Sequence, residues 1–413
     1  MTAEVTYQVV DNKDSLRELC ALVESLEPQD FISLDTEFMR ITSYYPDFSL
    51  LQLAIKGQNY LVDMWGLGEQ ALPLIVALCH TTAGVLSFGS IEDIGLIALW
   101  ARKAKCTPVL PMRFYDLQLM LSFSGQNKVF GLREALQSLL GVTLNKEYTR
   151  SNWTQRPLTT EQLRYSALDV NYLEPLYHLI YERMPVQNFS YFVEEMHHIC
   201  GQFVAEDDPD EAYLSISAAG MLSLKELNVL HYLARERMIY GMQHNQALNR
   251  VITSKAMWQL ARFTPTNKQE LLRRGVNSSA VRRHAPMILE WIKAAKRAPQ
   301  YEHLTIPYDY FSHQRALQEN FDYLKKQIRE RLQQTRALDE HLLLRKSLLN
   351  DYFRSLYLGT TPLLQQSWRL KVLGKLDVPL EPLSRLNLGT EEGSLGALSK
   401  EGVIMPPPFL TFR

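Results

Sequence analysis

The segment FISLDTEF, residues 31–38, runs from a largely apolar half into two carboxylates spaced two residues apart, Asp35 and Glu37. The apolar run predicts a buried strand, and residues i and i+2 of a strand point to the same face. Both carboxylates should therefore project together. Two neighbouring acids repel each other and lose hydration on burial, so the pair suggests a cation site. The alternative is a strand edge whose acids are simply solvated.

The segments on either side of this strand predict a mixed sheet covered by helices. We expect a short edge strand over 5–10 and a helix over 14–27 before it, and strands over 49–55 and 59–63 after it. Short links between the strands favour an antiparallel meander. Alternating elements follow: helices at about 69–80, 91–103, 116–123, 131–140 and 158–183, and strands at 84–88 and 113–115. This order predicts an α/β domain with helices packed on a mixed sheet.

Strand patterns end after about residue 205. An acidic linker, AEDDPDEA, occupies 205–212, and two blocks with helical periodicity follow, separated by a Pro-containing connector. We expect four parts, an α/β domain, two all-α domains and a tail without periodicity, with the bounds 1–205, 213–297, 303–375 and 376–413.

Charge is unevenly distributed along the chain. The 413 residues have a net charge of -1, but residues 221–300 hold 14 Lys and Arg and only 4 Asp and Glu, a net of +10. A basic block of this kind is either the solvated surface of a helical domain or a nucleic-acid contact. The charge count does not decide between the two.

The cysteines and the apolar runs indicate the compartment. The chain has four cysteines, which lie far apart and form no C-x-x-C pair, as expected for free thiols in a reducing compartment. The first residues, MTAEVTYQVV, lack the pattern of a signal peptide, and no apolar run has the roughly 18 residues of a membrane span. We expect a cytoplasmic protein with no membrane partner, and a monomer.

Two further acidic signals stand in the first 205 residues. Asp93 follows the expected strand at 84–88, a common position for ligand-site residues, although an acid at a helix N-terminus has the same pattern. Tyr165 and Asp169 are spaced i, i+4, so they share one face of the expected helix over 158–183. The alternative for that pair is a core tyrosine beside a solvated aspartate.

Taken in chain order, D-x-E on a strand, D after a later strand and Y-x-x-x-D on a late helix resemble the tyrosine-type branch of the DEDD exonuclease superfamily. Longer segments resemble the ribonuclease D family within it: LDTEF, YYP followed by LLQLA, GVTLNKEYTRSNWTQRPLT and YSALDVNYL, at 34–38, 44–46, 50–54, 141–159 and 165–173. Residues 221–297 resemble the HRDC module of that family, including ALNRVI at 247–252, and 303–374 resemble a weaker second module.

This resemblance implies a ribonuclease H-like exonuclease domain followed by two HRDC-type helical domains. It implies that Asp35, Glu37, Asp93 and Asp169 bind two divalent metal ions, Mg²⁺ or Mn²⁺, and that Tyr165 orients the attacking water. An oxygen-only ligand set suits these hard cations better than Zn²⁺. The sequence departs from the family at two positions. Phe88 stands where many relatives have a histidine, which puts fine substrate positioning in doubt but not the metal site. Asn145 stands where an aspartate is common, which is a minor departure.

Several aromatic and basic residues are candidates for RNA binding. The aromatic candidates for base stacking are Tyr44, Tyr45 and Trp153. The candidates for phosphate contact are Lys146, Arg150 and Arg156 on the expected loop, and Arg235, Arg237, Arg250, Arg273, Arg274, Arg282 and Arg283 in the first helical module. For each group an ordinary structural role is the alternative: core packing for the rings, a solvated loop for the first cations, and a protein contact for the module.

The resemblance implies a metal-dependent 3'–5' exoribonuclease. Its expected partner is RNA with a free 3' end, notably tRNA precursors, from which it would release nucleoside 5'-monophosphates. The residues themselves support only metal-assisted hydrolysis of a phosphodiester. Two alternatives stay open, a 3'–5' DNA exonuclease on the same fold and a non-catalytic RNA-binding protein.

Overall fold

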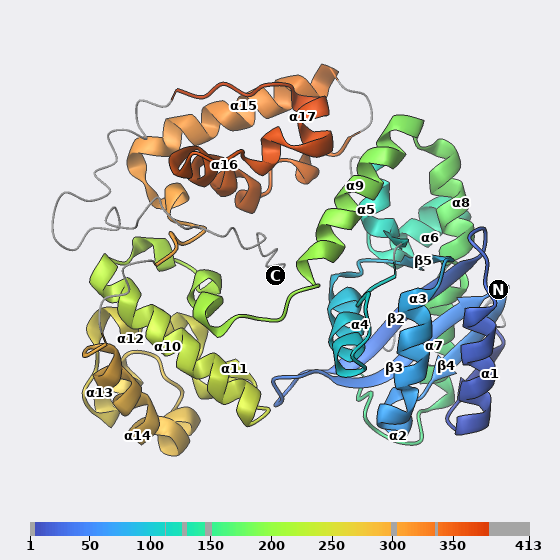
Figure 1. The fold of residues 1–413 in the computed structure, drawn as a ribbon, viewed down its shortest axis with the longest axis horizontal. Coiled ribbons are helices and arrows are strands. Elements are labelled where there is room, and N and C mark those ends of the chain that lie inside the picture. Colours follow the sequence, from blue (N-terminus) through green and yellow to red (C-terminus); the bar gives the residue numbers. More distant parts are fainter. Residues whose placement is uncertain are drawn as a thin grey trace. The chain divides into compact units, whose positions relative to one another are not determined.

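The computed structural model describes residues 5–111, 113–125, 130–144, 151–298, 304–334 and 338–379. The chain folds as two compact units (Figure 1). One takes the described residues of 1–39, 46–205 and 336–342, and the other takes those of 40–45, 206–335 and 343–413. The finer division of the second unit into two domains and a tail stays a prediction.

The first unit is built on a six-stranded mixed sheet, as predicted. Its strands are β1 (Tyr7–Val10), β2 (Phe31–Met39), β3 (Asp47–Ile55), β4 (Gln58–Val62), β5 (Gly84–Ser87) and β6 (Phe114–Asp116). They lie in the order β1-β4-β3-β2-β5-β6. Strand β3 is antiparallel to β2 and β4, and the remaining pairs are parallel. The acid-bearing strand β2 is therefore central.

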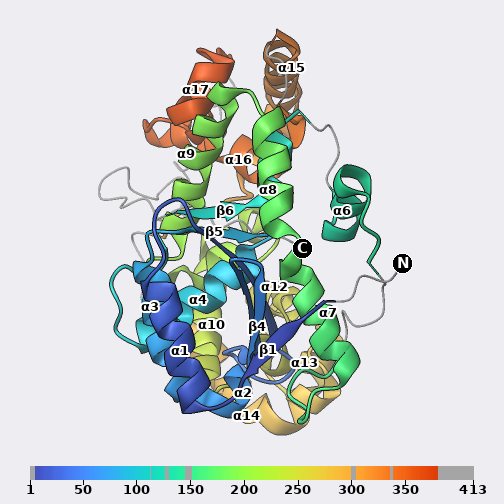
Figure 2. The ribbon, with the colours of Figure 1, turned by 90° about the vertical axis from the view of Figure 1, so that its right-hand side faces the viewer.

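Helices cover both faces of this sheet. They are α1 (Lys13–Glu24), α2 (Met64–Leu67), α3 (Leu72–His80), α4 (Ile91–Lys103), α5 (Leu117–Phe123), α6 (Leu132–Leu140), α7 (Thr160–Asn171), α8 (Leu173–Arg183) and α9 (Val186–Gln202). Figure 2 shows α1, α3 and α4 on one side of the sheet and α7 on the other. Helix α7 packs on β2, β3 and β4. Side chains alternate along a strand, so Asp35 and Glu37 face α7 and Thr36 faces the opposite side.

The single helix predicted over 158–183 is wrong. The Thr159–Gln162 capping box starts α7 as expected, but the helix ends at Asn171 and α8 begins at Leu173. Pro175 explains the break, because a proline has no N–H to donate and its ring collides with the carbonyl four residues earlier, that of Asn171. Tyr172, with φ −109° and ψ 2°, joins the two helices.

The second unit is helical, as predicted. Its helices are α10 (Leu224–Gln243), α11 (Leu248–Val251), α12 (Ser254–Phe263), α13 (Lys268–Arg273), α14 (Ser278–Ala295), α15 (Gln318–Gln334), α16 (Lys346–Leu358) and α17 (Ser367–Leu373). A capping box between Ser223 and Glu226 starts the long α10. None of the described helices combines the length and the apolarity that crossing a membrane requires.

Candidate active site

Three of the predicted acids meet on the α7 side of the sheet. Asp35 and Glu37 project from β2, and Asp169 projects from α7. One carboxylate oxygen of each lies within 4.8 Å of the corresponding oxygen of the other two. Strand alternation and the packing of α7 on β2 together produce this cluster. Three hard oxygen ligands at this spacing suit a divalent cation.

Asp93, the fourth predicted acid, lies beside this cluster but is held by other groups. The Thr36 hydroxyl donates a hydrogen bond to Asp93 Oδ1, and the Ser87 hydroxyl donates one of 3.3 Å to Oδ2. The charge of Asp93 nevertheless raises the pKa of both Asp35 and Glu37. The fourth carboxylate is thus within electrostatic reach of the other acids, and β2 and β5 fix its orientation.

The acids share a raised affinity for protons. Burial, followed by the charges of neighbouring acids, raises the pKa of Asp35 well above its ordinary value and that of Glu37 to about 9. Burial also raises the pKa of Asp169 to about 7 and that of Asp93 to about 6. Crowded, poorly hydrated carboxylates are costly to ionise, and a bound cation removes that cost.

Tyr165 lies where the i, i+4 spacing predicts. Its side chain is hydrogen-bonded to the Asp169 carboxylate, and burial raises the pKa of its phenol above the ordinary value. A phenol in this state keeps its proton at neutral pH, so it can donate a hydrogen bond but is a poor general base.

The prediction that Trp153 stacks on RNA bases is wrong. Only 2% of its surface is exposed, and it packs in a core cluster with Leu50, Leu61 and Ala167. Its ring centroid is 6.3 Å from that of Tyr165. A buried indole cannot accept a base, and its place beside the phenol makes it part of the support of Tyr165.

Two residues near the acids are not predicted from the sequence as part of the site. Asp116 at the end of β6 is buried, and its Oδ1 accepts hydrogen bonds of 2.9 Å from the backbone N–H groups of Gly89 and Gln118, while its Oδ2 accepts one of 2.9 Å from the N–H of Ser90. It thereby fixes the turn that leads into α4 and Asp93. Arg133 on α6 supplies a positive charge that partly opposes the rise in the pKa of Asp169 that burial causes. An aspartate before a helix does give a capping signal, but only the fold brings Gly89 and Ser90 to it.

Comparisons with known proteins identify the family. The model of the 3'-5' exonuclease family matches residues 7–185, and that of the HRDC domain matches residues 226–292. Ribonuclease D of Haemophilus influenzae is 31% identical over 297 residues, which cover 70% of this chain and 71% of that protein. Ribonuclease D of Pseudomonas paraeruginosa is 30% identical over 282 residues, covering 66% and 71%.

The chain belongs to the ribonuclease D family. Among solved structures, an Escherichia coli RNase D, described as an exoribonuclease involved in structured RNA processing, matches with a TM-score of 0.76 and 25% identity. The match covers 89% of this chain and 96% of that one. The chain is therefore a hydrolase of the 3'–5' exoribonuclease type, and its family implies divalent metal ions.

The structure describes only part of the loop that carries the predicted phosphate-binding residues Lys146, Arg150 and Arg156. Lys146, Arg150 and Asn145 lie outside the described residues. Arg156 is described, and its guanidinium binds both carboxylate oxygens of Asp63 and donates to the Ser49 carbonyl at 2.9 Å. A phosphate-binding role for Arg156 is therefore wrong, since its donors are already engaged with the folded chain.

Tyr44 and Tyr45 belong to the helical unit, although β2 and β3 flank them in sequence. The Tyr44 hydroxyl donates to Asp207 Oδ2 at 3.0 Å, and the backbone N–H of Tyr45 donates to Asn245 Oδ1 at 3.0 Å. Their rings meet edge to face with centroids 5.0 Å apart. Tyr45 keeps 37% of its surface exposed, so base stacking stays a prediction, whereas the hydroxyl of Tyr44 is engaged.

The predicted RNA-binding arginines of the HRDC region divide by burial. Arg237 is 3% exposed and donates to the Ile252 carbonyl at 2.9 Å, so its predicted phosphate contact is wrong. Arg235 is paired with Asp210 at 2.9 Å and with Glu236 at 2.6 Å. The side chains that remain exposed are Arg250, Arg273, Arg282 and Arg283. Their contact with RNA stays a prediction.

Proposed function

We propose that Asp35, Glu37, Asp93 and Asp169 hold two divalent cations, Mg²⁺ or Mn²⁺, at which RNA is hydrolysed from its 3' end to nucleoside 5'-monophosphates. The observation that carries the proposal is the group of three carboxylates whose ligand oxygens lie within 4.8 Å of one another, beside a fourth acid. The donor set contains only oxygens, which favours Mg²⁺ or Mn²⁺ over Zn²⁺. Such ions lower the pKa of bound water and neutralise charge on the leaving oxygen.

Tyr165 has the role of aiming the attacking water. Its hydroxyl is protonated, is hydrogen-bonded to Asp169 and rests beside the buried Trp153. A fixed hydroxyl can hold a water in line with the scissile phosphate, because positioning depends on direction and not on basicity. In this role Tyr165 orients the water and does not remove its proton.

Structured RNA, and tRNA precursors in particular, is the proposed substrate. The Escherichia coli relative is described as acting on structured RNA, and the exposed arginines of the helical unit give this chain cations with which to hold an RNA body. We further propose that the protein acts as a monomer in the cytoplasm. Its four free cysteines are consistent with a reducing compartment.

The test is to incubate the protein with 3'-extended tRNA in the presence and absence of Mg²⁺ or Mn²⁺, beside the variant Asp35→Asn. We expect stepwise shortening from the 3' end that needs the metal and is lost in the variant, with nucleoside 5'-monophosphates as products. Activity that persists in Asp35→Asn would refute the metal-site assignment.

A second pair of substrates tests the choice of nucleic acid. A single-stranded RNA and the same RNA with one terminal 2'-deoxynucleotide differ only in the group that separates RNA from DNA at that site. We expect faster removal of the ribonucleotide. Equal rates would favour the alternative of a 3'–5' DNA exonuclease.

A further inference from the structure

Gln52 is a buried amide directly opposite Asp35. It lies on β3, and the register of the antiparallel pair matches Asp35 with Gln52. Directly opposite residues share a face of the sheet, with Cβ atoms about 4.5–5.5 Å apart. Gln52 is 0% exposed, and neither its Nε2 nor its Oε1 has a hydrogen-bond partner among the described residues. Buried polar groups nearly always have hydrogen-bond partners, so the lack of one for this amide needs an explanation.

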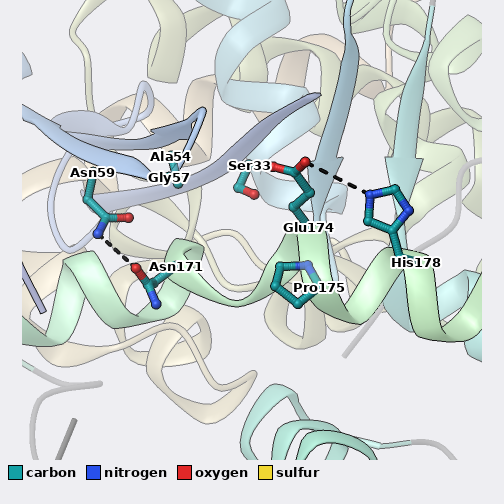
Figure 3. Close-up of a pocket in the computed structure, with 8 residues that line it drawn as sticks. All are labelled: Ser33, Ala54, Gly57, Asn59, Asn171, Glu174, Pro175 and His178. Carbon is teal, nitrogen blue, oxygen red and sulfur yellow. Dashed lines mark hydrogen bonds and ion pairs between the residues drawn. The ribbon is translucent and has the colours of Figure 1, made fainter. Parts of the chain in front are cut away.

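Two other buried oxygens on this face border a pocket large enough to admit water. Ser33 Oγ and Asn59 Oδ1 also lack partners within the chain. Both residues line a pocket of about 230 Å³ between the sheet and the start of α8, beside Glu174 and His178 (Figure 3). A polar pocket of that size admits water, which can satisfy them.

Gln52 is not among the residues that line this pocket. On its own face, the register places the apolar Leu61 on one side of it and Asp35 on the other. The next residue of β3 on this face, Leu50, is apolar as well. Asp35 is therefore the polar residue directly opposite this amide, whereas Ser33 and Glu37 on β2 and Asn59 on β4 lie diagonally from it.

We propose that Gln52 is a positioning residue whose Nε2 donates a hydrogen bond to the Asp35 carboxylate when that carboxylate holds a divalent cation. The inference rests on the proposed metal site. A carboxylate that binds a metal through one lone pair keeps another for a donor, and such a donor fixes the direction in which it points. The amide suits this place because it is neutral, so it orients Asp35 without competing with the cation.

The test compares Gln52→Met with Ser33→Ala. Methionine matches glutamine in length and flexibility but offers no N–H donor. Ser33→Ala is the matched control, because it removes a buried, unpartnered oxygen from the same face, two residues from Asp35. Titration calorimetry of each metal-free protein with MnCl₂ measures affinity directly, and thermal unfolding without metal measures the fold. Gln52→Leu is a second apolar variant should the methionine protein fail to fold.

We expect Gln52→Met to bind Mn²⁺ at least about tenfold more weakly than the wild type and to lower kcat on a short RNA by a similar factor, with KM unchanged. Its unfolding temperature without metal should not fall, since no hydrogen bond is lost in that state. Ser33→Ala should match the wild type. An Mn²⁺ affinity of Gln52→Met equal to that of Ser33→Ala would overturn the positioning role alone. A wild type that binds no Mn²⁺ would overturn the proposed metal site and this inference with it.

Discussion

The hydroxyl of Thr36 on β2 donates a hydrogen bond to the buried carboxylate of Asp93 on α4, 57 residues further along the chain. Thr36 is the middle residue of the D-x-E motif, and its side chain points away from the face of Asp35 and Glu37. One three-residue segment therefore supplies two acids on one face of the sheet and, on the other face, a donor that orients a third acid. All three residues of the motif therefore contribute a side chain to the acidic site or to its support.

Replacing Thr36 by valine should impair the site while preserving its shape. Among the side chains that the structure describes, Asp93 would keep the Ser87 donor alone, and the loss of a hydrogen bond to a buried carboxylate should lower the free energy of unfolding by about 1–3 kcal/mol. We expect a loss of activity of about tenfold or more, as for other groups that orient metal ligands. Urea unfolding and single-turnover hydrolysis measure the two effects. Thr36→Ser keeps the hydroxyl and should stay near the wild type; equal losses in both variants would show that packing matters and the hydrogen bond does not.

Replacing Tyr165 by phenylalanine should lower turnover and leave RNA binding nearly unchanged. The hydroxyl is the only group removed, and its hydrogen bond to Asp169 lies within the acid cluster. We expect kcat to fall by about 10²-fold or more, in the range typical of lost positioning. Turnover and equilibrium binding of a short RNA separate the two effects. A large loss of binding would contradict the role of aiming water.

Without metal, the protein should be less stable at pH 8 than at pH 5. Glu37 and Asp169 have a folded pKa of about 9 and about 7, against ordinary values of 4.5 and 3.8. Between about pH 4 and 9 the folded protein therefore holds protons that the unfolded chain has lost. Stability falls with rising pH wherever the folded state binds more protons. Urea unfolding in EDTA across this range measures the slope.

Glu37→Gln is the control for this pH dependence. The variant removes one of the two groups named and one charge that acts on Asp35, so its stability should depend less steeply on pH. Saturating Mn²⁺ should flatten the wild-type profile in the same way, because the bound cation favours the ionised acids. A profile of Glu37→Gln that coincides with the wild type would place the pH dependence elsewhere in the molecule.

Replacing Trp153 by alanine should act on stability. The indole is buried against Leu50, Leu61 and Ala167, and truncating a buried tryptophan lowers the free energy of unfolding by about 3–5 kcal/mol. Trp153→Phe should lose less, because it keeps a ring beside Tyr165. Denaturant unfolding and the RNA affinity of the folded Trp153→Phe protein are the measurements. A variant of unchanged stability that binds RNA more weakly would restore the stacking role.

Removing the exposed charges of Arg282 and Arg283 should weaken tRNA binding in a salt-dependent way. Each phosphate contact that is lost should reduce the slope of log affinity against log salt by about 1. Binding of Arg282→Gln/Arg283→Gln to tRNA at several salt concentrations measures this slope. Arg235→Gln is the matched control, because its guanidinium is already paired with Asp210 and Glu236. A slope that changes in the control and not in the double variant would place the RNA on a different face.

The strands, and the faces of strand and helix on which the acids lie, were predictable from the sequence because both depend on local spacing. Asp35 and Glu37 share a face through the two-residue period of a strand, and Tyr165 and Asp169 share one through the turn of a helix. The break at Tyr172 could also be predicted from Pro175, because a proline disrupts a helix through the carbonyl four residues before it. The apolar periodicity continues across the break, and for that reason the pattern predicts one helix.

What the sequence by itself determined is therefore the strands of the sheet, the faces on which the acids lie and, through its motifs, the family. The tertiary structure alone decided which groups meet. It buried Trp153 and Arg237, paired Arg156 with Asp63, and set Thr36 against Asp93 and Gln52 against Asp35. The physical reason is that backbone periodicity fixes the face on which a side chain lies. The neighbour across that face depends on strand register and helix packing, which bring together residues far apart in the chain.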